Sequence, residues 1–153
     1  MHMKDIFNFE LKKITKRLEL VRTELRANST WDLLFYQGDF DTENLDDVRC
    51  IAQCHQCFKS WFNIGFRDFE SNRLSDLVRD GLLSAEDISN YQLAEVFAMG
   101  DSVFYRTKLE AGANYVAVKC TRCNTHHFLV LGITETQPTR YAGALNGMWL
   151  MRE

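Results

Sequence analysis

The chain has 153 residues, of which 46% are hydrophobic, 12% aromatic and 25% charged, with a formal net charge of −3. One proline, eight glycines and nineteen aromatic residues exclude a disordered chain, and a length near 150 predicts a single domain spanning residues 1–153. No apolar run approaches the roughly 20 residues of a membrane-spanning helix, and the N-terminus lacks the apolar segment of a secretion signal, so we expect a cytoplasmic protein.

The first segment predicts a long basic helix over residues 5–27. Residues 1–3 are left out of this prediction because they are consistent with a cloning remnant ahead of a natural start at Met3. From Phe7 to Leu25, apolar residues recur at intervals of three and four, which is the spacing of one helix face. Residues 1–27 contain seven bases and four acids, so this helix would be basic.

A strand at residues 31–36 and a turn at residues 37–39 lead into an acidic loop. Residues 39–47, DFDTENLDD, contain five acids and no base. Such a loop attracts a basic partner through charge complementarity, although it is also consistent with an ordinary solvated loop. The residues that we predict to contact a partner are Asp39, Phe40, Asp41, Glu43, Asp46 and Asp47.

The middle and end of the chain alternate between strands and helices. Residues 48–54 and 58–66 are rich in β-branched and aromatic residues and predict two strands. Residues 67–100 predict a helical insertion with two helices, one ending at Gly81 and one that starts at a capping box and ends at Gly100. Further strands are expected at residues 115–119, 128–133 and 141–151. The predicted fold is therefore α+β, with an antiparallel sheet, a long N-terminal helix and a two-helix insertion.

Four of the five cysteines form two C-x-x-C turns between predicted strands, which predicts a zinc ribbon. The expected ligands are Cys54, Cys57, Cys120 and Cys123. Zn²⁺ prefers four tetrahedral ligands, and a C-x-x-C turn lets two thiolates converge on one ion. Two disulfides conflict with a reducing compartment, and a thioredoxin-like site needs a C-x-x-C that opens a helix. Four thiolates leave no open coordination position, so the expected zinc is structural.

The remaining cysteine and the histidines near the turns leave alternatives open. Cys50 is expected to be a buried small side chain, with a role as an alternate ligand left open. His55, His126 and His127 lie close enough in sequence to replace one cysteine, but four cysteines at suitable spacing favour a surface or supporting role for these histidines.

The sequence contains none of the common catalytic motifs, so no enzymatic activity is expected. G-x-G-x-x-G, P-loop, G-x-S-x-G and H-E-x-x-H patterns are all missing. Two binding functions remain. The first is a zinc-stabilised protein-binding module whose acidic loop meets a basic partner. The second is a nucleic-acid-binding zinc ribbon that would use the basic first helix together with Lys119 and Arg122, against which the acidic body of the chain argues.

The segment from Val118 to Ala142, which contains KCTRCNTHHFLVLGITETQPTRY, resembles a C-terminal pattern of small bacterial proteins with paired C-x-x-C turns. Some of these are immunity-type proteins, which neutralise a toxin delivered by a neighbouring cell. The resemblance implies a cytosolic inhibitor of a basic toxin, often a nuclease. The absence of a long apolar run separately predicts no membrane association. The basic first segment departs from this pattern because such an inhibitor does not require it.

Overall fold

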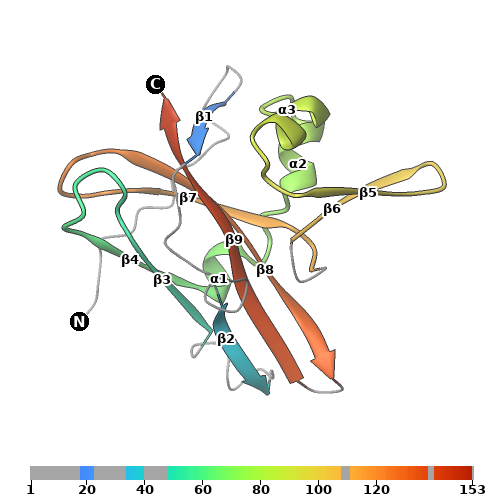
Figure 1. The fold of residues 1–153 in the computed structure, drawn as a ribbon, viewed down its shortest axis with the longest axis horizontal. Helices are drawn as coiled ribbons and strands as arrows, with labels where there is room; N and C mark the ends of the chain where they lie inside the picture. Colours follow the sequence, from blue (N-terminus) through green and yellow to red (C-terminus); the bar gives the residue numbers. More distant parts are fainter. Residues whose placement is uncertain (1–17, 23–33, 40–47, 108–110, 138–139, 153) are drawn as a thin grey trace.

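The computed structural model describes residues 18–22, 34–39, 48–107, 111–137 and 140–152 (Figure 1). These residues form nine strands and three short helices. In chain order the elements are β1 (Glu19–Arg22), β2 (Leu34–Asp39), β3 (Arg49–Gln53), β4 (Trp61–Gly65), α1 (Phe66–Phe69), α2 (Leu74–Arg79), α3 (Ala85–Asn90), β5 (Glu95–Met99), β6 (Ser102–Arg106), β7 (Asn114–Lys119), β8 (His126–Gln137) and β9 (Arg140–Arg152).

The long strand β9 lies inside the main antiparallel sheet. On one side it pairs with β8, and β7 follows beyond β8. On its other side, β9 pairs with β2 near its start and with β1 near its end. The two-stranded hairpins β3–β4 and β5–β6 form separate sheets.

Both faces of the main sheet are covered, because its side chains alternate between two apolar cores. The first core lies against α2 and α3 and takes from β7, β8 and β9 the residues Ala117, Phe128, Val130 and Trp149. The second core lies against hairpin β3–β4 and α1 and takes from the same strands Val116, Val118, Leu129, Leu131 and Met148. This double covering explains why β7 and β8 carry continuous apolar runs instead of the alternation of a half-exposed strand.

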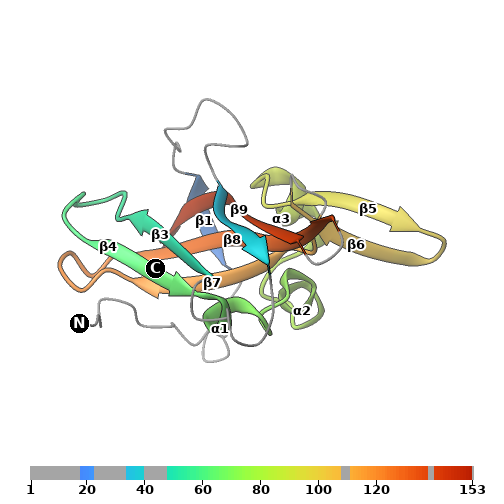
Figure 2. The ribbon, with the colours of Figure 1, turned by 90° about the horizontal axis from the view of Figure 1, so that it is seen from below.

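The hairpins are arranged so that two of their turns meet. Hairpins β3–β4 and β7–β8 turn on the same side of the molecule, whereas hairpin β5–β6 projects on the opposite side (Figures 1 and 2). The projecting hairpin exposes Val96, Met99, Val103 and Phe104. None of the helices in the described ranges is long and apolar enough to cross a membrane.

The predicted helix over residues 5–27 is wrong. Within that range Glu19–Arg22 form β1, which pairs with the end of β9, and the Leu18 amide donates to the Leu82 carbonyl at 2.9 Å. Leu18 and Leu20 are buried while Glu19 is exposed, which is the alternation of a strand. Pairing with a distant strand overrides the local helical spacing. The rest of the predicted helix lies outside the described residues.

The predicted two-helix insertion is also wrong, and the fold is predominantly antiparallel β. Three short helices replace two longer ones, and the second predicted helix ends at Asn90 instead of Gly100. Its capping box is confirmed, since the Asp87 amide donates to Ser84 Oγ at 3.1 Å and the Ser84 amide donates to Asp87 Oδ2 at 2.8 Å. Gly100 instead opens the turn of hairpin β5–β6 with a φ of 62°. The predicted turn at residues 37–39 belongs to β2.

Candidate metal centre

The first C-x-x-C turn connects β3 to β4. Cys54 follows the last residue of β3, and its amide donates to the Ser60 carbonyl at 2.8 Å, which closes the loop. The Phe58 amide donates to the Cys54 carbonyl at 3.2 Å, so the chain folds back within the motif. This reversal points the sulfurs of Cys54 and Cys57 to the same side.

The second turn, between β7 and β8, repeats this conformation. The Cys120 amide donates to the Thr125 carbonyl, and the Asn124 amide donates to the Cys120 carbonyl, both at 2.9 Å. The residue after each second cysteine is left-handed, with φ of 58° at Phe58 and 61° at Asn124. The two turns are therefore local copies of one structure, built on different hairpins.

The four predicted ligands come together in one cluster. Their sulfur atoms all lie within 4.8 Å of one another. Cys54 Sγ lies 3.7 Å from Cys123 Sγ, and Cys57 Sγ lies 3.8 Å from Cys120 Sγ. A tetrahedron with metal–sulfur bonds of about 2.3 Å has edges of roughly 3.8 Å, so the spacing suits a metal ion. A disulfide needs about 2.05 Å, and all five cysteines are free thiols.

Hydrogen bonds from the turns support negative charge on the sulfurs. The amides of Gln56 and Cys57 lie 3.4 and 3.5 Å from Cys54 Sγ. Burial nevertheless raises the pKa of Cys54 to about 12, because these amides only partly oppose desolvation. At Cys120, burial raises the pKa, but hydrogen bonds from Ser60 and from the amides of Cys123 and Arg122 outweigh it, so the pKa falls to about 6. The donors favour the charged sulfurs that a metal requires.

Cys50 is set apart from this cluster. It faces Ile64 across hairpin β3–β4, is 2% exposed and belongs to the second apolar core. Burial raises its pKa to about 12, which keeps it a neutral thiol. The four-cysteine group found among the described residues does not include it, which agrees with the expectation of a buried small side chain.

His127 joins the two turns, which is the supporting role that the sequence left open for three histidines without identifying the one that has it. Its Nδ1 lies 3.3 Å from the Thr125 carbonyl, which can only accept, so Nδ1 carries the proton. Its Nε2 is then free to accept from the His55 amide, 3.2 Å away in the first turn. The Phe62 ring packs edge-on against the imidazole with centroids 4.9 Å apart. Burial lowers the pKa of His127 to about 4, so the ring is neutral, as both bonds require.

The other histidines also lie outside the four-sulfur group. The His55 ring stacks on Phe58 with centroids 5.9 Å apart. His126 opens β8, where it faces Lys119 across the strand pair. The position of a histidine next to a C-x-x-C motif thus did not reveal which one supports the cluster, because that depends on how the two hairpins meet.

Of the six residues predicted to contact a partner, only Asp39 lies within the described residues. Asp39 is the last residue of β2 and faces Arg140 of β9 in the strand register. Phe40, Asp41, Glu43, Asp46 and Asp47 lie outside the described residues.

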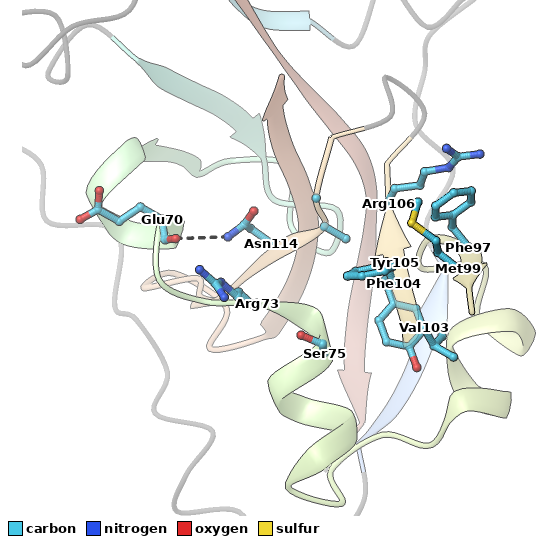
Figure 3. Close-up of a pocket in the computed structure, with 12 residues that line it drawn as sticks. Glu70, Arg73, Ser75, Phe97, Met99, Val103, Phe104, Tyr105, Arg106 and Asn114 are labelled. Carbon is cyan, nitrogen blue, oxygen red and sulfur yellow. Dashed lines mark hydrogen bonds between the residues drawn. The ribbon is translucent and has the colours of Figure 1, made fainter. Parts of the chain in front are cut away.

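A cavity of about 730 Å³ lies between hairpin β5–β6 and the segment that joins α1 to α2 (Figure 3). Phe97, Met99 and Val103 give it an apolar wall, and Arg73 and Asn114 contribute polar groups. Asn114 Nδ2 donates to the Phe69 carbonyl at 3.0 Å and approaches the Glu70 carbonyl at 3.4 Å. The lining of this cavity includes neither cysteine nor histidine, so the cavity is separate from the sulfur cluster.

Comparison with protein families, with curated proteins and with solved structures finds no match to this chain.

Proposed function

We propose that the chain is a zinc-stabilised binding module in which the metal holds two hairpins together and takes no part in a reaction. The observation that carries this proposal is the four-sulfur cluster, whose edges fit a tetrahedral ion and whose four positions are all protein ligands. Cys54, Cys57, Cys120 and Cys123 would hold the ion. A closed thiolate site supplies folding energy and offers no position for substrate or water.

The donor set decides which metal is proposed. Four thiolates in a tetrahedral arrangement suit zinc and also suit iron. Zinc is redox-inert and is the usual ion of paired C-x-x-C turns on hairpins. Four reduced thiols further require a reducing compartment, in agreement with a cytoplasmic protein.

The proposed partner is a basic protein, such as a toxin domain that the chain neutralises by direct binding. Support comes from the five acids of residues 39–47 and from the resemblance of residues 118–142 to immunity-type proteins. Negative charge on the module would steer a basic partner toward it and favour correct pairing.

Metal analysis of purified protein tests the zinc centre. We expect one zinc per chain, and cobalt in its place should give the strong visible absorption of tetrahedral thiolate coordination. Cys54→Ser and Cys123→Ser should each lose the metal. Cys50→Ala is the matched control, because it removes a buried thiol outside the cluster and should retain one zinc. Iron in the isolated protein, or zinc retained at wild-type affinity in both serine variants, would contradict the proposal.

A further inference from the structure

The outer face of hairpin β3–β4 exposes large apolar side chains beside the sulfur cluster. Ile51 is 61% and Trp61 55% exposed, while their strand neighbours are buried in the second core. Gln53 faces Trp61 in the register and Ile51 faces Asn63, so Ile51 and Trp61 are diagonal neighbours on the outward face. Phe58, 51% exposed, extends this apolar surface into the first C-x-x-C turn.

Phe58 occupies a backbone conformation that disfavours it. Its φ of 58° is left-handed, where a bulky side chain is a conformational outlier, whereas the second turn has Asn124 at the matching position. The Phe58 carbonyl accepts from Gln53 Nε2 at 2.8 Å, which ties the loop to the strand. Its half-exposed ring gains little burial in return for the strain. Such a strained, exposed residue is typical of a functional surface.

Positive charge lies on the same hairpins as these rings. Residues 48–66 and 114–137, which form the two hairpins that carry the cluster, contain four lysines or arginines and one acid, Glu135 near the end of β8, although the whole chain has a net charge of −3. Lys59 follows Phe58 directly, and Arg122 precedes the ligand Cys123. Arg49 is exposed on the outward face of β3, where its Nε donates to Asn63 Oδ1 at 2.8 Å. The four thiolates and a divalent ion together contribute −2, so this region stays positive. We call Arg49, Ile51, Phe58, Lys59, Trp61 and Arg122 the knuckle face.

We propose that the knuckle face binds single-stranded nucleic acid. Exposed aromatic rings stack on unpaired bases of any sequence, and clustered cations neutralise the phosphates, which is how single strands are bound without sequence preference. Trp61 and Phe58 supply the rings, and Arg49, Lys59 and Arg122 supply the phosphate contacts. An acidic protein would also meet the positive charge, and competition by poly-glutamate distinguishes this alternative. This surface is separate from residues 39–47 and goes beyond the proposed binding of a basic protein.

Fluorescence anisotropy with a labelled 12-nucleotide oligo-dT and the zinc-loaded full chain tests the proposal. Three phosphate contacts on a single strand predict a slope of log K against log salt near −2, so binding weakens about 15-fold between 50 and 200 mM salt. Lys59→Glu should lower the magnitude of that slope by about 0.7 or more. Trp61→Thr and Phe58→Asn, which keep strand and left-handed preferences respectively, should each weaken binding roughly 5- to 150-fold.

Matched variants on other surfaces separate stacking from general attraction. Phe104→Thr removes a ring that is 50% exposed on hairpin β5–β6, and Arg67→Glu reverses an exposed charge on α1. Both should bind the oligonucleotide like wild type. Zinc content and circular dichroism identify variants that fold. The proposal is overturned if wild type does not bind at 50 mM salt, if folded ring variants bind as tightly as wild type, or if poly-glutamate competes as well as unlabelled oligo-dT, which would indicate a site for acidic proteins.

Discussion

At the scale of single residues, His127 ties the two C-x-x-C turns together through a bond to the backbone. It accepts from the His55 amide and donates to Thr125, and it is fully buried. Removing a hydrogen-bonding side chain from a buried site costs about 1–3 kcal/mol. We therefore expect His127→Ala to lower the free energy of unfolding by that amount at pH 7. In His127→Gln, the side-chain carbonyl can reach the Nε2 position and should retain most of that stability.

Comparison of wild type with His127→Gln also gives a prediction for the pH dependence of stability. Burial lowers the pKa of His127 from 6.5 to about 4, so the unfolded chain binds more protons between these values. The stabilisation is complete above pH 6.5 and is lost as the pH falls toward 4. Between pH 7 and pH 5, wild type should lose more unfolding free energy than His127→Gln, by up to about 2 kcal/mol. Urea unfolding of both zinc-loaded proteins at the two pH values measures this difference, and parallel losses would contradict it.

At the scale of the element, β9 depends on a glycine that gives space to a tryptophan. A Cβ at Gly147 would overlap the six-membered ring of Trp149, whereas one at Gly112 would meet nothing within 4 Å. Trp149 is buried in the first core, and its Nε1 donates to the Tyr91 carbonyl at 2.9 Å, beyond the end of α3.

Gly147→Ala should displace the indole and weaken this bond. Overpacking and a lost hydrogen bond together predict a decrease of about 2–4 kcal/mol in the free energy of unfolding. Gly112→Ala is the control and should change that free energy by less than about 1 kcal/mol. Chemical unfolding followed by tryptophan fluorescence compares them. Equal effects of the two substitutions would mean that the indole tolerates the added methyl group.

Features that depend on local sequence were predicted correctly, whereas elements that depend on distant strand pairing were not. The C-x-x-C turns were located correctly because ligand spacing is local chemistry, and Ser84 with Asp87 correctly marked the start of α3. The spacing of Leu18, Leu20 and Val21 fits both a helix and a strand, because intervals of two and three residues coexist within so short a segment. Pairing with β9, about 130 residues later, decides it. The prediction that the second helix continues to Gly100 was wrong for a similar reason, because Val96 and Phe97 pair with β6 across the turn at Gly100.

At the scale of the molecule, the charges separate into regions of opposite sign. The two cluster-bearing hairpins contain four lysines or arginines and one acid, Glu135, whereas residues 39–47 contain five acids. Composition alone gives only the net charge of −3, and the contact between the hairpins is needed to see that these two basic segments meet at one sulfur cluster. One module could therefore present an acidic surface to a basic protein and a positive surface to a polyanion, and the two functions can be tested independently.

Charge reversal in the acidic segment tests the protein-binding function. Asp39→Lys, Asp41→Lys and Glu43→Lys together change the formal net charge from −3 to +3. Reversing the exposed acids Glu70, Glu86 and Asp101 makes the same total change elsewhere and is the control. With the basic partner recovered from nuclease-treated lysate, the first variant should associate at least about 10-fold more slowly and with weaker salt dependence than the control, because local complementarity steers encounter more than total charge. Equal association rates would remove residues 39–47 from the interface, while unchanged oligo-dT binding would leave the knuckle face intact.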